Sequence, residues 1–230
     1  MKLYFYSNIT NINSYFIVNE ESTTKEGIVI DPTHINEHLI EKIENERVLL
    51  KLVLLTNASH PNIFCGINSL EKVYKVQSYS VNSIGKTKEI QTPIYESENL
   101  QIEAYPIKMN GQNVCMYKIG LVLFTGLTFS DIFISSSTPS FLEKIERERI
   151  KELLFSLNEA TLCFSLSGPP FTIKTFKFYA NNWLFNHPRH NLKMQSLTKI
   201  KKLAKVAMQH IKHSLKDFLK HLERHSKKSI

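Results

Sequence analysis

The spacing of apolar and polar residues predicts a run of short strands in the first part of the chain. Lys2–Tyr6, Ser14–Val18 and Gly27–Ile30 are apolar or alternating segments separated by turn-forming residues, as strands are. The apolar run Val48–Leu55 predicts a buried strand that leads directly into the polar sequence T-N-A-S-H-P-N. Because ligand sites lie where such strands end at the edge of a sheet, this turn is the first candidate for a functional site.

Helical spacing follows between the strands, and a second group of strands comes later. Apolar residues three or four apart predict helices at His34–Asn45, Asn68–Val76 and Phe141–Leu157, with Thr33 as a candidate cap for the first. Further strands are predicted at Val73–Ser78, Gln101–Ile107, Val114–Ile119, Leu121–Thr125 and Thr161–Leu166. The hairpin between the third and fourth of these turns at Gly120. Strands and helices mixed in this way predict a domain of the α/β (α+β) class.

The last part of the chain follows a different pattern. The turn His187-Pro188-Arg189-His190 indicates a boundary, which divides the chain into a domain over residues 1–186 and a tail over residues 187–230. In the tail, apolar residues recur in steps of three and four, at Ile200, Leu203, Ala204, Ala207, Ile211, Leu215, Phe218, Leu219 and Leu222. This stripe predicts a continuous amphipathic helix over Leu192–Ser229.

Positive charge is concentrated in this tail. The whole chain has a formal net charge of +8, whereas residues 187–230 contain ten lysines and two arginines against one aspartate and one glutamate. One interpretation is an anionic partner, either nucleic acid or a membrane surface. The other is a solvated lysine face, whose apolar stripe packs on the domain or pairs with a second copy in a homodimer. The candidate contact residues are Lys199, Lys201, Lys202, Lys205, Lys212 and Lys216.

Cysteine usage and hydropathy exclude several classes of protein. Cys65, Cys115 and Cys163 are far apart and form no C-x-x-C pair, which argues against a disulfide framework and against a cysteine zinc site. The first residues lack the features of a signal peptide, and no apolar run approaches the roughly 18 residues that span a bilayer. We therefore expect a cytoplasmic protein.

The polar turn resembles the metal-binding loop of the metallo-β-lactamase superfamily, T-H-x-H-x-D-H-x-x-G. In one frame Thr56 matches the threonine, and the His, His, Asp and His ligand positions are taken by Asn57, Ser59, Pro61 and Asn62. Either this frame or its neighbour keeps at most one ligand.

The neighbouring frame is shifted by one residue. It places His60 on the second histidine, Asn62 on the aspartate and Gly66 on the glycine. Ala58 and Ile63 then stand at the other two histidine positions.

Four other strings resemble motifs of the same superfamily, in the same order along the chain. N-S-Y followed by I-V-I-D-P, which contains Asp31, is similar to the family's opening hairpin. Lys108 in P-I-K-M-N-G takes the place of a third histidine, and Leu127 in F-T-G-L-T takes the place of the bridging aspartate of F-T-G-D-T. Ser167 stands at the last histidine of a string that resembles the glyoxalase II (hydroxyacylglutathione hydrolase)-like branch.

The resemblance implies a four-layer αββα sandwich and, in the family, bound zinc. The tail adds a basic C-terminal helical extension to this sandwich. Zinc sites need neutral imidazoles, carboxylates or thiolates. The ammonium of Lys108 repels a dication, Leu127 has no donor atom, and serine and asparagine are weak ligands. We therefore predict no metal and no other cofactor, and Lys108 becomes a candidate anion-binding residue.

Two hypotheses for function remain open. The first is a degenerate metallo-β-lactamase-fold protein, a pseudoenzyme that has lost the metal ligands and acts as a non-catalytic binding or interaction protein. The alternative is a hydrolase of the superfamily, acting on thioesters or phosphoesters with a rebuilt active site. Asp31 is interpreted as a turn-former and helix-start acid, and His60 as a loop histidine.

Overall fold

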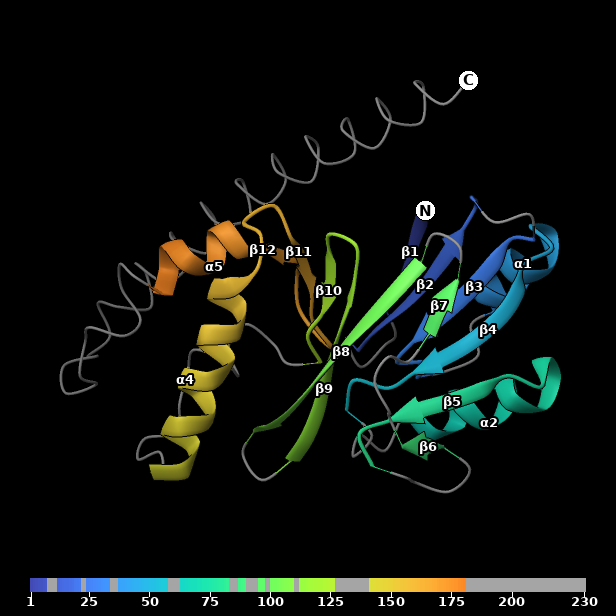
Figure 1. Ribbon diagram of the computed structural model, residues 1–230. Coiled ribbons are helices and arrows are strands. Elements are labelled where there is room, and N and C mark those ends of the chain that lie inside the picture. The colour runs from blue at the N-terminus through green and yellow to red at the C-terminus, as the bar shows by residue number, and fades with distance from the viewer. Residues whose placement is uncertain are drawn as a thin grey trace, which may run out of the picture.

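Two six-stranded β-sheets form the centre of the computed structural model, which describes residues 1–7, 12–21, 24–33, 37–57, 63–82, 87–89, 95–97, 100–109, 112–126 and 141–180 (Figure 1). The first sheet contains, side by side, β1 (Lys2–Ser7), β2 (Asn13–Asn19), β3 (Glu26–Ile30), β4 (Leu49–Leu54), β5 (Gln77–Ser80) and β6 (Lys88–Glu89). The second contains β7 (Tyr95–Ser97), β8 (Leu100–Met109), β9 (Gln112–Ile119), β10 (Val122–Phe124), β11 (Leu162–Phe164) and β12 (Phe171–Thr172). Each sheet is therefore built from one half of the described chain.

Both sheets mix parallel and antiparallel pairs. β1, β2 and β3 pair antiparallel, whereas β3, β4, β5 and β6 run parallel. In the second sheet β10 and β11 are parallel and the other pairs are antiparallel. Parallel neighbours end at the same edge of their sheet, so the segments that follow β3 and β4 come together, as do those that follow β10 and β11.

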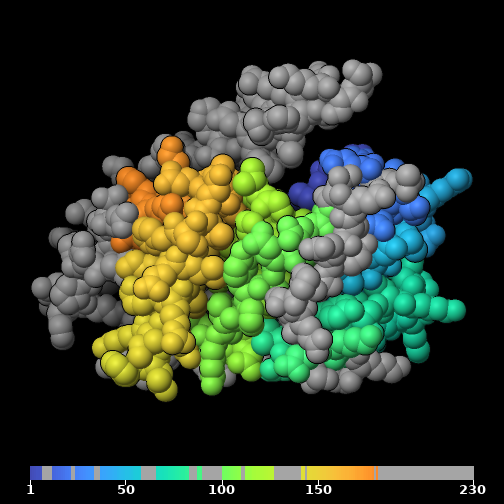
Figure 2. Space-filling view, viewed as in Figure 1, coloured from blue at the N-terminus to red at the C-terminus, as the bar shows by residue number. Residues whose placement is uncertain are grey.

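Four described helices cover the outer faces of the sheets. α1 (Glu37–Asn45) and α2 (Ile63–Tyr74) lie on the first sheet, and α4 (Phe141–Ser156) and α5 (Ile173–Tyr179) lie on the second. Figure 2 shows α4 and α5 on one flank of the molecule and the elements of the first half on the other. The layers are helix, sheet, sheet, helix, as the resemblance implied.

The alternation of side chains along the strands explains why three apolar cores form. On β2, Tyr15 and Ile17 point between the two sheets, whereas Phe16 and Val18 point to α1 and α2. The strands of the second sheet divide their side chains in the same way between the inner core and the core under α4 and α5. A strand with both faces covered is apolar throughout, which accounts for the long apolar runs in the sequence.

The predicted elements are largely confirmed. The strands of the first half and the hairpin at Gly120, whose φ is 58°, lie where the spacing placed them. α2 begins at Ile63 rather than at Asn68, and β5 begins only at Gln77, after the helix has ended. The described part of α1 begins at Glu37, and the hydroxyl of Thr33 lies 3.2 Å from that of Ser14.

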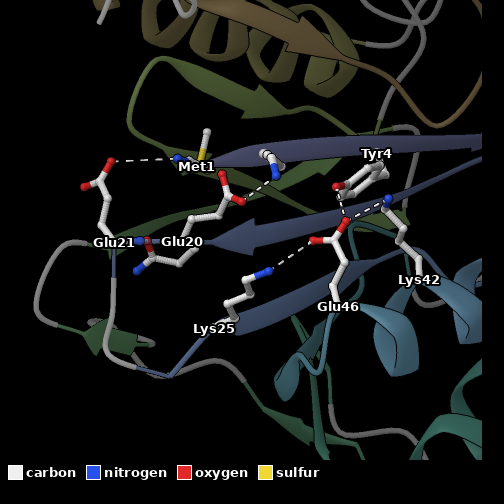
Figure 3. Close-up of polar contacts among 9 residues, drawn as sticks. Met1, Tyr4, Glu20, Glu21, Lys25, Lys42 and Glu46 are labelled. Atoms are coloured by element: carbon white, nitrogen blue, oxygen red, sulfur yellow. Dashed lines mark hydrogen bonds and ion pairs between the residues drawn. The ribbon is translucent and has the colours of Figure 1, made fainter. Parts of the chain in front are cut away.

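The edge strand β1 is tied to α1 by a polar cluster on the outside of the first sheet (Figure 3). The Tyr4 hydroxyl donates to Glu46 at 2.8 Å, and the Lys42 ammonium lies 2.7 Å from the same carboxylate and 4.6 Å from the Tyr4 ring centroid. Lys25 lies 3.9 Å from Glu46 on the other side. Two ammonium groups and one hydroxyl thus share the Glu46 carboxylate at the outer side of the edge strand.

The tail prediction over residues 187–230 lies outside the described residues. Within the described part, no helix is long and apolar enough to cross a membrane.

Candidate functional site

The candidate site lies at the edge of the sandwich where the parallel strands end. Asp31 follows β3 and Thr56 comes two residues after β4 in the first sheet. Gly126 and Ser167 follow β10 and β11 in the second sheet. The sequence resemblance marks all four positions, and the strand directions bring the two members of each sheet to this edge.

Asp31 and Thr56 form the centre of this edge. The Thr56 N–H donates to one carboxylate oxygen of Asp31 at 2.8 Å, and the Thr56 hydroxyl pairs with the other at 2.5 Å. Both residues are 1% exposed, and Asp31 has a φ of 51°. Asp31 is thus a turn residue, as expected, and its carboxylate is buried. It fixes the direction in which the chain leaves β4.

Two glycines leave just enough room for this pair. A Cβ at Gly126 would lie 2.5 Å from the Thr56 Cβ, and Gly126 also has a φ of 64°. A Cβ at Gly66, on α2, would lie 2.1 Å from the carbonyl oxygen of Pro32. The glycines of the two motif strings are therefore required by close packing.

The same pair is bound to the second sheet. The Cys115 N–H on β9 donates to the Thr56 carbonyl oxygen at 2.8 Å. Two residues along β9, the Tyr117 hydroxyl donates to the Leu55 carbonyl oxygen at 3.0 Å. Both bonds are buried, so they join the end of β4 firmly to the opposite sheet.

A second set of buried bonds joins β2 to the segment after β11. The Tyr15 hydroxyl donates to the Ser165 carbonyl oxygen at 2.6 Å, and the Asn13 side-chain amide donates to the carbonyl oxygens of Ser165 and Gly168 at 3.0 and 3.1 Å. The Asn13 backbone N–H donates to the Leu166 carbonyl oxygen at 2.8 Å. Asn13 therefore shapes the segment that carries Ser167.

Burial changes the acidity of the groups at this edge. It raises the pKa of Asp31 from its ordinary 3.8 to about 7, and the hydrogen bonds from Thr56 oppose part of that rise. Burial also raises the pKa values of Tyr15, Cys115 and Tyr117, and the charge of Asp31 adds to each rise. Cys115 is thus a buried neutral thiol, not a nucleophile.

Side-chain amides cross between the sheets next to the buried pair. Asn57 donates to the side-chain oxygen of Gln112 at 3.2 Å, and Asn113 donates to that of Asn82 at 3.2 Å. The first pair links the end of β4 to β9, and the second links the end of β5 to the same strand. Hydrogen bonds between carboxamides therefore span the edge on which the metal-binding motif falls.

Lys108 lies on a strand, one residue beyond the predicted strand end at Ile107. It is on β8, opposite Asn113 of β9, and it is exposed. In the alternation of β8 it belongs to the row of Ile102 and Ala104, which face the core between the sheets. Lys108 therefore continues that inner row beyond the core, toward the carboxamides.

The structure describes some of the other predicted site residues and leaves others undescribed. Ser167 is half-buried, forms an antiparallel bridge with Ile12, and accepts the Ser165 hydroxyl at its carbonyl oxygen at 2.9 Å. Ser59, His60, Asn62 and Leu127 lie outside the described residues. Gln112, Asn113 and Cys115 were not predicted, since no motif or spacing distinguishes them.

The described donors at this edge do not fit a zinc or iron ion. Asn57 offers an amide already paired with Gln112, Lys108 offers a cation, and Ser167 offers a hydroxyl. Among the residues that the structure describes, no three His, Cys, Asp or Glu side chains converge as a metal site.

No family model matches the chain, and a comparison with curated proteins finds no match. Solved structures of the metallo-β-lactamase superfamily do match. The chain is similar to ETHE1 from Myxococcus xanthus, with a TM-score of 0.57 and 16% identity over 77% of this chain and 82% of that one. It is also similar to a metallo-β-lactamase from Staphylococcus aureus, with a TM-score of 0.59 and 16% identity over 83% of this chain and 64% of that one.

An archaeal superfamily protein from Sulfolobus tokodaii, ST1585, has a TM-score of 0.52 and 13% identity, covering 92% of this chain and 98% of that one. The chain therefore has the metallo-β-lactamase fold, which confirms the fold predicted from the sequence. Identities this low establish the fold alone.

Proposed function

We propose that this protein is a metallo-β-lactamase-fold protein that binds a ligand or partner without catalysis and without a metal ion. The observation that carries the proposal is the pairing of Asn57 with Gln112, which links the two sheets by an amide hydrogen bond at the ligand-loop position. An amide nitrogen that donates to a neighbour is not a metal ligand. The remaining positions, Ser59, Asn62, Leu127 and Ser167, are equally poor donors.

The chemistry at the edge favours a ligand with oxygen acceptors. Lys108 adds an exposed positive charge on the inner row, and the amides of Gln112 and Asn113 lie on the paired strand. An anionic or carbonyl-rich ligand suits such a group. The motif around Ser167 supports a relationship to the glyoxalase II-like branch. The described cysteines, Cys115 and Cys163, form no disulfide, which suits a cytoplasmic location.

The basic tail supplies a second contact in this proposal. Its lysines at 199, 201, 202, 205, 212 and 216 suit an anionic partner, either nucleic acid or a membrane surface. Its apolar stripe suits packing on the domain or pairing in a homodimer.

The alternative, a hydrolase with a rebuilt site, needs an accessible group that activates water. Asp31 has a pKa in the neutral range, but both of its oxygens are engaged by Thr56 and its side chain is buried. A general base must reach the proton that it abstracts. The geometry of Asp31 therefore favours the binding protein over the hydrolase.

Elemental analysis of the purified full chain tests the proposal. We expect less than one zinc or iron per chain, after purification without chelator and with zinc in the growth medium. His60→Gln is the control, because His60 is the one histidine in the ligand loop. Stoichiometric metal that is lost in His60→Gln, together with hydrolysis of a thioester, would establish the hydrolase instead.

A further inference from the structure

β1 is the longest of the four strands that end the described sheets. The first sheet ends in β1 and β6, and the second ends in β7 and β12. β6 and β12 have two residues each and β7 has three, whereas β1 has six. Proteins keep the edges of their sheets from pairing with other chains by shortening the edge strands or by placing charges on them. β1 is long, and Lys2 at its start is its only charged residue.

The backbone groups of β1 that point away from β2 belong to alternate residues. On β3, the Asp31 N–H donates to a carbonyl oxygen of β4 at 3.0 Å, so the backbone groups of Ile30 point the other way, toward β2. Ile30 pairs with Tyr15 of β2, and the next residue, Phe16, therefore directs its backbone groups to Tyr4 of β1. The even-numbered residues of β1 are thus bonded to β2, and the odd-numbered residues face outward.

The outer edge of β1 therefore presents the N–H and carbonyl groups of Leu3, Phe5 and Ser7. None of the described strands pairs with this edge. The Phe5 side chain is 52% exposed, and its ring centroid lies 5.7 Å from that of Tyr15 in the core. A row of open donors and acceptors beside an exposed aromatic ring is a template for another β-strand. A helix such as the predicted tail cannot fill it, because the backbone groups of a helix are already bonded.

We propose that the outer edge of β1 pairs with the same edge of a second copy of this chain, antiparallel about a two-fold axis at Phe5. Phe5 of one copy then lies opposite Phe5 of the other, and Leu3 lies opposite Ser7. This register gives a partner to every outward-facing residue from Leu3 to Ser7, and it joins the two first sheets into one. An interface that uses the same surface on both copies closes with two chains and leaves neither β1 edge open.

The charges near β1 are compatible with this pairing. Like charges directly opposite each other on paired strands are destabilising, but Lys2 stands just outside the paired segment, at opposite ends of it in the two copies. Lys2 is also paired with Glu20 at 2.5 Å. Lys42 and Glu46 belong to α1 and pair with each other at 2.7 Å over the outer face of the sheet (Figure 3). The paired segment itself is uncharged.

Both faces of β1 also match their own copy across the axis. On the inner face, Leu3 packs against the core between the sheets, and Phe5 of the two copies would meet beside it. On the outer face, Tyr4 and Tyr6 pack against the core under α1, and each lies opposite the other in the proposed register. Aromatic pairs across antiparallel strands are favourable contacts. The second copy therefore covers the exposed ring of Phe5 with apolar surface.

Sedimentation equilibrium of the full chain tests the pairing. An interface built on one pair of strands is small, so we expect a reversible dimer that forms at about 10–100 µM, with twice the mass of the chain. Phe5→Lys places two ammonium groups at the axis and should raise the dissociation constant about tenfold or more. Phe5→Pro removes an N–H that bonds only across the axis, and it should weaken the dimer as well. Phe141→Lys, the same substitution at an exposed residue of α4, is the matched control and should dimerise like the wild type.

The comparison is made between folded variants. Thermal unfolding at about 1 µM, where the proposed dimer is dissociated, should give each variant a single transition like that of the wild type. A wild type that remains monomeric at about 100 µM would overturn the proposal. Equal weakening by Phe141→Lys and Phe5→Lys would overturn it too, because the association would then depend on exposed apolar residues in general.

Amide hydrogen exchange of the wild type locates the interface without any substitution. Protection of the Leu3 and Phe5 amides should rise with protein concentration, because these N–H groups face solvent in the single chain and are bonded in the dimer. The Tyr4 amide, which is bonded to β2, should be protected at every concentration. A dimer in which the Leu3 and Phe5 amides stay unprotected would be formed by another surface, such as the tail, and the pairing through β1 would be wrong.

Discussion

The backbone of Gly126 lies directly against the side chain of Thr56: a Cβ on Gly126 would stand 2.5 Å from the Thr56 Cβ and 2.7 Å from its hydroxyl oxygen. The first residue belongs to the F-T-G string after β10, and the second to the loop after β4. Motif residues from the two halves of the chain thus meet at a packed junction. Packing in the fold explains why both residues match the family's motifs, and this packing requires no metal.

Replacement of Gly126 by alanine tests this close approach. Gly120 is the matched control, because it also has a positive φ, 58° against 64°, but a methyl group there would have no described atom within 4 Å. Gly120→Ala should cost about 1 kcal/mol for the left-handed backbone alone. Gly126→Ala should cost about 1–3 kcal/mol more because of overpacking, as measured by denaturant unfolding. Equal losses would contradict the junction.

Removal of the Asn13 side chain tests the bonds that shape the segment around Ser167. Asn13→Ala breaks the two side-chain bonds to Ser165 and Gly168, whose carbonyl oxygens lie near the second sheet. We expect a loss of about 1–3 kcal/mol in the free energy of unfolding, since buried groups lose their partners. The matched control is Asn82→Ala, which removes an exposed amide contact and should change stability by less than about 0.5 kcal/mol. A loss at Asn82 as large as that at Asn13 would refute the assignment.

Much of the fold could be predicted because its chemistry is local. Alternating and continuous apolar runs identify strands with one or both faces buried, and Gly120 marks a hairpin. The spacing predicts the start of α2 at Asn68, later than the observed start at Ile63, because polar residues before Ile63 interrupt the helical spacing. Short edge strands such as β6 and β12 have only two residues each, too few to show a period.

The site was harder to predict than the fold. The strings around Asp31, Thr56 and Gly126 indicated that these residues belong together, but spacing along the sequence does not reveal that Asp31 is buried. That depends on the parallel pairing of β3 with β4 and on the covering by Gly126. The position of Gln112 and Asn113 at this edge follows only from the pairing of β8 with β9.

The basic tail gives a prediction that can be tested without its structure. If its lysines contact phosphates, the full chain should bind unrelated DNA and RNA sequences with similar affinity, and binding should fall steeply between about 50 and 200 mM salt. Truncation at Arg189 should abolish binding and leave the sandwich folded. No retention of the full chain on either nucleic acid at low salt would refute this, and aggregation on truncation would indicate a mainly structural helix.

The thermal unfolding of the full chain with and without metal tests the central claim most directly. A ligand present at 100 times its dissociation constant stabilises a folded protein by about 2.7 kcal/mol, which raises Tm by several degrees in a chain of this size. If hydrogen bonds around Asp31, Thr56 and Asn57 hold the edge without a metal, Tm should change by less than about 1 °C between a chelator and excess zinc. A rise of several degrees in zinc that His60→Gln removes would contradict the account.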